Sequence, residues 1–163
     1  MALWVIRGGN EGELHEDRDF REGCVAVGWG DMGDLTPLNT KASLLHRMGQ
    51  VWPEWTGPQV SNMGGQLWSF KADIGRGDLV FRRLKKRPAL FAIAEVTGDY
   101  RYRPDFEEFP GYPHTREARW ISHGTPRDSL EPEMLKFLGQ PRTVFQVKQD
   151  FVVERIQSMA SRG

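Results

Sequence analysis

Five basic residues within six positions form the most chemically distinctive part of this sequence. The window lies between two strand-like segments and contains Arg82, Arg83, Lys85, Lys86 and Arg87, with Arg76 a few positions before it. Cations at a hairpin tip suit phosphate groups, because phosphate contacts supply much of the affinity of a protein for nucleic acid. The alternative interpretation is a solubilising tip whose charges discourage edge pairing. We favour phosphate binding.

A second basic pair lies further along the chain, where Arg101 and Arg103 alternate with Tyr100 and Tyr102. Side chains alternate between the two faces of a strand, so the arginines are expected on one face and the tyrosines on the other. We therefore include Arg101 among the predicted phosphate-binding residues.

The sequence is also rich in tryptophan, with six in 163 residues. Trp29 follows the apolar segment 24–28, and Trp120 occupies another predicted junction between a strand and a loop. Two facing indoles would sandwich a planar base, and such stacking is worth about 1–3 kcal/mol per base. A base can enter this kind of pocket only when it is single-stranded or flipped out of a duplex. The alternative is that Trp29 caps the core; Trp68, on a predicted helix, is a secondary pocket candidate.

Motifs for catalysis are not evident. The sequence lacks a glycine-rich phosphate loop and a nucleophile elbow. One cysteine and four scattered histidines give no metal-ligand spacing. The acidic residues within 11–22 and 105–108 are interpreted as parts of solvated loops. We predict a binding protein without a metal or a cofactor, and a small metal-dependent nuclease is the weaker alternative.

Length and composition indicate a single domain over residues 1–163. No apolar run approaches the roughly 18 residues of a membrane span, and no signal peptide is recognisable. The only cysteine, Cys24, lies in an apolar run, which favours a buried thiol in a cytoplasmic protein. The formal net charge is zero, so affinity for nucleic acid must come from a local patch.

Periodicity and turn residues predict an α+β fold. Strands are predicted at 3–7, 24–28, 79–82, 89–96, 116–121 and 143–147, and helices at 41–51, 60–74, 131–138 and 149–159, while 11–21 is a charged loop or a short helix. Thr40 and Ser61 are the predicted N-caps of the first two long helices. The nearly all-apolar segment 89–96 is typical of a central strand. The mixture predicts a small, curved, mixed sheet or barrel with short helices.

An ordered set of short segments resembles the EVE/YTH-like branch of the PUA superfamily. The segments are 7–10 (RGGN), 27–30 (VGWG), Asn62 with 65–70 (GQLWSF), 74–80 (IGRGDLV), 93–100 (IAEVTGDY) and 113–120 (PHTREARW). Over about residues 3–147, the chain is similar in particular to modified-DNA recognition domains. These are fused to prokaryotic modification-dependent restriction endonucleases of the McrB, Mrr and HNH kinds.

The resemblance implies a barrel-like sheet wrapped by helices and a pocket for a flipped, methylated base. In the YTH relatives one cage tryptophan comes from a Gly-Val-Trp-Ser segment, which corresponds to Trp29. Another comes from an Ile-His-Trp segment, which corresponds to Trp120. Gly30 stands where the relatives have serine, so the hydrogen bond of that serine must come from backbone or from another residue. The other residues assigned to the base are Arg7, Gly8, Gly9, Asn10, Asn62 and Trp68.

We therefore predict a DNA-binding domain that recognises a methylated base, of the 5-methylcytosine or 6-methyladenine class, by flipping it into an aromatic cage. Its expected partner is double-stranded DNA with a modified base, and no membrane is involved. The domain would direct a fused or associated nuclease or NTPase in modification-dependent restriction, a form of phage defence. The alternative is a PUA-like module that reads modified RNA.

Overall fold

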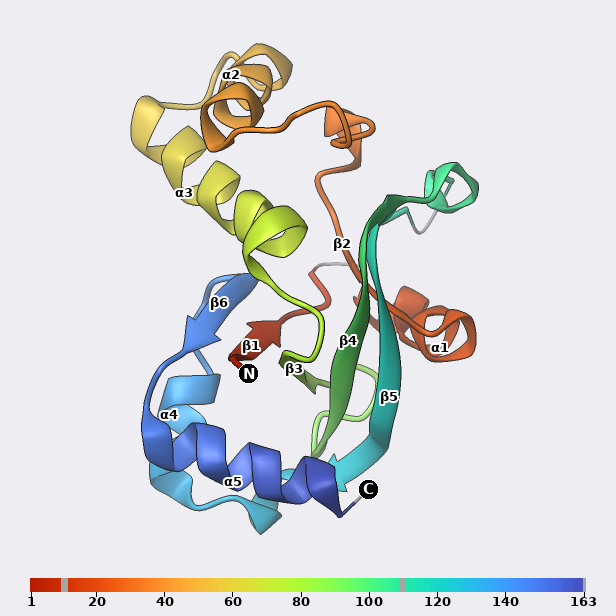
Figure 1. The fold of residues 1–163 in the computed structure, drawn as a ribbon, viewed down its shortest axis with the longest axis vertical. Helices are drawn as coiled ribbons and strands as arrows, with labels where there is room; N and C mark the ends of the chain where they lie inside the picture. The colour runs from red at the N-terminus through yellow and green to blue at the C-terminus, as the bar shows by residue number, and fades with distance from the viewer. Residues whose placement is uncertain (10–11, 109–110, 163) are drawn as a thin grey trace.

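The computed structural model describes residues 1–9, 12–108 and 111–162, with the side chains of all of these except 12 and 13. A six-stranded sheet in the order β2-β5-β4-β3-β1-β6 runs through the described residues. The strands are β1 (Leu3–Ile6), β2 (Cys24–Val27), β3 (Leu79–Arg83), β4 (Leu90–Tyr102), β5 (His114–Pro126) and β6 (Val144–Val147). The sheet is curved and does not close into a barrel (Figure 1).

Only one pair of neighbouring strands in this sheet is parallel, namely β1 with β3; the other pairs are antiparallel. The predicted hairpin is confirmed, because β3 pairs with β4 from Leu79–Glu95 to Arg83–Phe91. The interior position of β4 explains why segment 89–96 is apolar on both faces. The predicted α+β fold with a curved mixed sheet is therefore confirmed.

Helices gather at both ends of the sheet (Figure 1). They are α1 (Gly12–Glu22), α2 (Lys41–Val51), α3 (Gly57–Trp68), α4 (Pro132–Leu138) and α5 (Asp150–Ser161), with short 3₁₀ turns at Gly30–Met32, Pro104–Phe106 and Arg127–Ser129. α2 and α3 pack together at one end, α4 and α5 lie at the other, and α1 lies beside β2. Within the described residues, no helix has the length and apolar character needed to cross a membrane.

The sheet separates two hydrophobic cores. Along β1, Trp4 and Ile6 point into the first core, which is shared with α2 and α3. Leu3 and Val5 point into the second core, which is shared with α4 and α5. This is the side-chain alternation of a strand that is buried on both faces. Cys24 is buried as predicted, and burial raises the pKa of its thiol to about 12.

One predicted helix start is confirmed and the other is wrong. Thr40 caps α2 by accepting a hydrogen bond from the backbone of Ser43 at 3.1 Å. Ser61, however, lies inside α3, whose N-cap is Thr56 in a reciprocal capping box with Gln59. The apolar stripe begins only at Val60, so periodicity alone misses the polar first turn that the capping box creates.

Candidate nucleic-acid interface

The loop after β1 and the β3–β4 hairpin meet at a cavity of about 320 Å³. We call it the cation pocket; its lining residues are Arg7, Gly8, Arg83, Leu84, Lys85 and Pro88. Two groups of predicted residues, one assigned to a base and one to phosphates, thus lie side by side. Three cations around one cavity of this size are suited to an anionic group such as a phosphate.

α1 holds the hairpin in place through its carboxylates. The two oxygens of Glu16 accept hydrogen bonds from the backbone N–H groups of Lys85 at 2.8 Å and Lys86 at 3.0 Å. The Lys86 ammonium donates to Asp17 at 2.7 Å, and this contact holds the pKa of Asp17 below its usual value. Lys86 is therefore ion-paired with Asp17 of α1, whereas Arg83 has no ion-pair partner within the described part of the chain.

Arg82 is buried, which corrects its assignment as a phosphate contact. Its side chain is 1% exposed, and Nη1 donates to Asp19 Oδ2 at 2.8 Å. His15 joins the same cluster, with Nδ1 2.6 Å from Asp19 Oδ2 and Nε2 3.0 Å from the Gly8 carbonyl oxygen. Strand alternation explains the difference, because it turns Arg82 inward and Arg83 outward.

The same cluster shows that the acidic residues of segment 11–22 are not all solvated, and of the two predicted alternatives, a loop or a short helix, the helix is confirmed. Most of the segment forms α1, with Glu16 only 2% exposed and Asp19 fully buried. The Glu16 carboxylate is paired with backbone N–H groups of the hairpin, and the Asp19 carboxylate with Arg82 and His15, which makes their burial tolerable. The α1 segment therefore binds both the hairpin and the loop after β1, and fixes these two parts of the predicted site.

Trp29 is fixed through its backbone, in the left-handed region at φ 60°. Its carbonyl oxygen accepts hydrogen bonds from Met32 N and from His114 Nε2, both at 3.0 Å. The Tyr100 hydroxyl lies 2.7 Å from His114 Nδ1, to which it donates, and it accepts from Leu35 N at 3.2 Å. Burial lowers the pKa of His114 to about 4, so the ring is neutral at pH 7 and donates to Trp29 through Nε2.

Trp120 does not face Trp29. It is 9% exposed, and its indole N–H points to the carbonyl oxygens of Asp19 and Cys24, both at 3.2 Å. Cys24 begins β2 and Trp29 follows its other end, so the length of β2, roughly 10 Å, lies between the two positions. Trp120 packs edge-to-face on Phe20 at 4.7 Å within the core. The predicted sandwich of Trp29 and Trp120 is therefore corrected: the described structure does not form it.

Tyr112 is an aromatic residue that the sequence analysis did not identify, and it lies against Gly28, the residue before Trp29. Its ring lies 4.3 Å from that of His15 and covers two glycines. A Cβ on Gly9, where φ is 66°, would lie 2.5 Å from the Tyr112 hydroxyl, and one on Gly28 would lie 3.7 Å from Cζ. Only glycine fits at position 9, for both reasons. The sequence signal that could have identified it is an aromatic residue between Gly111 and Pro113.

The remaining predicted residues are dispersed. Asn10 lies outside the described residues. Arg76 is exposed and paired with Asp99 at 2.9 Å, and Arg101 lines a separate cavity of about 460 Å³. Trp68 packs against the first core with Lys71 Nζ 5.4 Å from its ring. Asn62 lines a groove between α3 and β6, Gly30 faces Pro113, and Arg87 is exposed at the hairpin tip.

Across 1–9, 12–108 and 111–162, no three His, Cys, Asp or Glu side chains are grouped so that they could hold a metal ion.

Comparison with known proteins places the chain in a class with the fold of YTH domains. The YTH domain of Zygosaccharomyces rouxii MRB1, in complex with N6-methyladenosine RNA, matches with a TM-score of 0.52 and 13% identity, covering 98% of this chain and 86% of that one. The YTH domain of Pho92, in complex with m6A, also matches with a TM-score of 0.52, at 12% identity over 99% of this chain and 85% of that one. The EVE/YTH-like part of the resemblance is thereby confirmed at the level of the fold.

The family itself is defined by a sequence model that matches residues 4–148. The chain belongs to this family, described as a domain of unknown function (DUF8426). No curated protein matches the sequence.

Proposed function

We propose that this protein is a non-enzymatic reader of a methylated base in nucleic acid. The observation that carries the proposal is the position of the Gly8–Gly9 loop. One side of the loop faces the aromatic ring of Tyr112, and the other lines the cation pocket with Arg83 and Lys85. The YTH domains with this fold bind N6-methyladenosine RNA or m6A, which supports the same class of ligand here.

In the proposed mechanism, the cation pocket binds a phosphate next to the modified nucleotide. The flipped base stacks against Trp29, and Tyr112 replaces Trp120 as the second aromatic residue. Backbone groups of Gly8 and Gly9, together with Asn10, read the polar edge of the base. A methyl group filling an apolar slot adds about 1–3 kcal/mol of discrimination, which is tenfold or more in affinity.

We further propose that the ligand is double-stranded DNA with 5-methylcytosine or 6-methyladenine. The protein would then direct an attached nuclease or NTPase to modified DNA in modification-dependent restriction. The sequence resemblance to modified-DNA recognition domains supports this choice. A reader of modified RNA is the second candidate, and it is favoured by the RNA bound to the MRB1 YTH domain.

Fluorescence anisotropy with a panel of labelled oligonucleotides tests the proposal. The panel contains DNA duplexes with 5-methylcytosine, 5-hydroxymethylcytosine, 6-methyladenine or no modification, and single-stranded RNA with or without N6-methyladenosine. We expect one modified ligand to bind at least tenfold more tightly than its unmodified counterpart. Trp29→Ala should abolish that preference, because it removes the stacking surface.

The matched control is Trp68→Phe, which changes an indole outside the proposed pocket. Equal affinity for every modified and unmodified pair would refute the proposal. Preference for the modified RNA would assign the protein to the second candidate, and metal-dependent cleavage of plasmid DNA would support a nuclease.

A further inference from the structure

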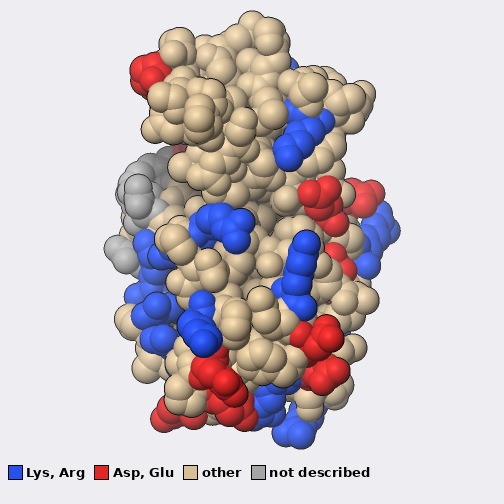
Figure 2. Space-filling view, turned by 90° about the vertical axis from the view of Figure 1, so that its left-hand side faces the viewer, with Lys and Arg blue, Asp and Glu red and all other residues tan. Residues whose placement is uncertain are grey.

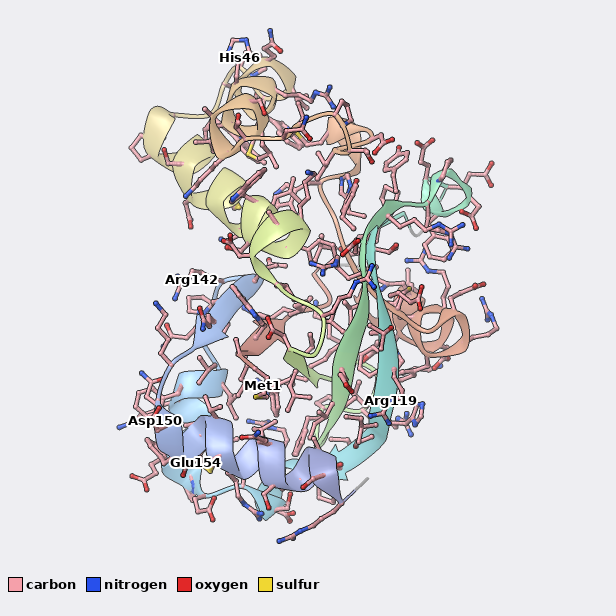
Figure 3. All side chains as sticks on the ribbon, in the orientation of Figure 1. Met1, His46, Arg119, Arg142, Asp150 and Glu154 are labelled. Atoms are coloured by element: carbon pink, nitrogen blue, oxygen red, sulfur yellow. The ribbon has the colours of Figure 1, made fainter. Side chains whose placement is uncertain are left out.

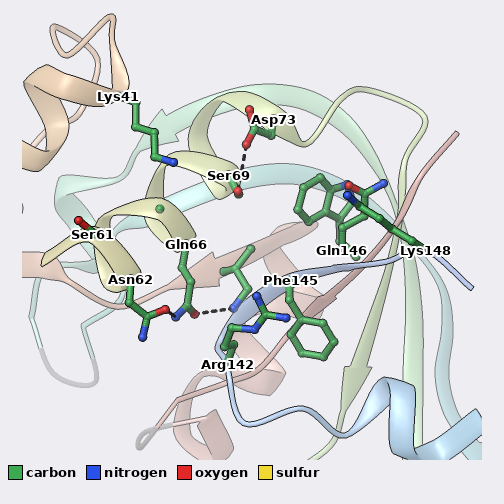
Figure 4. Close-up of a pocket in the computed structure, with 13 residues that line it drawn as sticks. Lys41, Ser61, Asn62, Gln66, Ser69, Asp73, Arg142, Phe145, Gln146 and Lys148 are labelled. Carbon is green, nitrogen blue, oxygen red and sulfur yellow. Dashed lines mark hydrogen bonds between the residues drawn. The ribbon is translucent and has the colours of Figure 1, made fainter. Parts of the chain in front are cut away.

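A second, larger cavity of about 540 Å³ lies between α3 and the edge strand β6. Figure 4 shows side chains of α2, α3 and β6 converging on it, and Figure 3 places Arg142 beside β6. We call it the α3–β6 groove; the residues that matter for its chemistry are Lys41, Asn62, Gln66, Asp73, Arg142 and Lys148. Its volume is in the range of about 300–1,000 Å³ typical of small-ligand pockets.

The groove carries an excess of positive charge. Lys41, Arg142 and Lys148 line it, and none of them forms an ion pair with a described residue. Its only lining carboxylate, Asp73, accepts a hydrogen bond from Ser69 at 3.0 Å. Figure 2 views the molecule from the side of α3 and β6, and cationic side chains lie across the middle of this face. In a chain of zero net charge, such a concentration favours an anionic ligand.

The floor of the groove is a fixed polar surface. Gln66 is 7% exposed, and its Oε1 accepts from Thr143 N at 2.8 Å and Val144 N at 3.1 Å. Its Nε2 donates to Asn62 Oδ1 at 3.2 Å, which fixes the orientation of the Asn62 amide among the lining residues. An exposed amide held in one orientation is suited to hydrogen bonding with phosphate oxygens or base edges.

The groove adjoins the cation pocket through one short segment. Arg7, which lines the cation pocket, donates from its backbone to Thr143 O at 2.8 Å and from Nη1 to Pro141 O at 2.9 Å. Arg142, between these two residues, lines the groove. The cations of the two cavities therefore follow one another across the end of β1 and the start of β6.

We propose that the α3–β6 groove binds the sugar–phosphate backbone of the strand that carries the flipped base, at nucleotides next to that base. This inference rests on the proposed function and deepens it. Continuity with the cation pocket favours a nucleic-acid strand over a separate acidic peptide, because one polyanion can contact both sets of cations. The groove would then supply affinity, while the aromatic residues supply selectivity.

The test compares two variants in salt titrations of DNA binding. Probes are short DNA duplexes with a central 5-methylcytosine or 6-methyladenine and the unmodified duplex of the same sequence. The groove variant combines Lys41→Gln, Arg142→Gln and Lys148→Gln. The control variant combines Arg119→Gln, Lys136→Gln and Arg162→Gln, which removes the same charge from exposed positions outside the groove. Thermal unfolding checks that both variants fold.

We expect the groove variant to bind modified and unmodified duplexes at least tenfold more weakly, with an unchanged ratio between them. Its slope of log affinity against log salt should be shallower by about 2–3, because each phosphate contact contributes about 0.9. Unchanged affinity and slope would overturn the inference, as would an equal effect of the control variant. Binding of labelled polyglutamate to the parent protein that is lost in the groove variant, together with unchanged duplex affinity in that variant, would assign the groove to an acidic protein partner and also overturn the inference.

These results separate the inference from the proposed function. If Trp29→Ala loses the preference for the modified duplex and keeps the salt slope, that result reports on the base pocket and not on the groove. A parent protein that binds duplexes and RNA without preference for the modified forms refutes the modified-base reader, while the groove variant still reports on the backbone site. A parent protein that binds none of the duplexes and none of the RNAs refutes both.

Discussion

At the scale of single residues, the candidate base site depends on a hydrogen bond from a buried histidine. His114 holds the carbonyl of Trp29 in a left-handed conformation that non-glycine residues seldom adopt. Because Tyr100 donates to Nδ1, the neutral ring has one tautomer that satisfies both neighbours. His114 and Tyr100 thus fix the position of Trp29, the proposed stacking surface, although neither is among the proposed ligand contacts.

This arrangement predicts a dependence of stability on pH. Burial lowers the pKa of His114 to about 4 from 6.5, so between these values the unfolded chain binds a proton that the folded chain does not. Stability is therefore fully present above pH 6.5 and falls as the pH drops toward 4. The loss is about 3 kcal/mol, at about 1.4 kcal/mol per pH unit. Urea unfolding between pH 7.5 and 4 measures it.

His114→Gln should flatten most of this decline, because glutamine does not titrate. His46→Gln is the matched control, since His46 is exposed in the middle of α2, at the end of the molecule opposite α5 (Figure 3). A decline of equal size in His114→Gln would contradict the assignment to this histidine.

At the scale of elements, α1 and the β3–β4 hairpin divide the basic residues of the hairpin into structural and available ones. Arg82 and Arg83 are neighbours in β3, but one enters the buried cluster with Asp19 and the other lines the cation pocket. Removal of one partner from a buried ion pair typically costs about 3–5 kcal/mol, because the other charge stays buried.

We therefore expect opposite phenotypes from two adjacent substitutions. Arg82→Ala should lower the free energy of unfolding by about 3–5 kcal/mol. Arg83→Ala should leave stability within about 0.5 kcal/mol of the parent and reduce the salt slope of nucleic-acid binding by about 0.9. Urea unfolding and salt titration of both variants decide the matter. Equal destabilisation, or a larger change of slope in Arg82→Ala, would show that the division is wrong.

The elements also show how far sequence reasoning extends. The Thr40 cap and the β3–β4 hairpin were predictable, because their signals lie within a few residues of one another. The burial of Arg82 depends on Asp19, 63 positions away, and the Trp120 indole donates to a carbonyl 101 positions away. Charge and aromaticity identified these residues as noteworthy, but their side of the sheet is decided by pairings between distant segments.

At the scale of the whole molecule, the two faces of the sheet differ in their relation to the proposed ligand-binding residues. The core with α2 and α3 lies on the side that holds Trp29, whereas the core with α4 and α5 contains none of the proposed ligand-binding residues. The family match ends at residue 148, before α5 begins. Nevertheless, Val152 and Ile156 of α5 are fully buried in the second core. α5 is therefore part of the folded unit that supports the site.

This separation predicts that α5 contributes stability without selectivity. Ile156→Ala should lower the free energy of unfolding by about 2–5 kcal/mol, because it leaves a cavity in the second core. Glu154→Ala, on the exposed face of the same helix, should change it by less than about 0.5 kcal/mol. Urea unfolding measures the first effect, and the oligonucleotide panel at a temperature where Ile156→Ala is folded should give the parent ratio for modified over unmodified ligand. A changed ratio in the folded variant would mean that the second core positions the base site through the sheet, and the proposed division between the two faces would then be untenable.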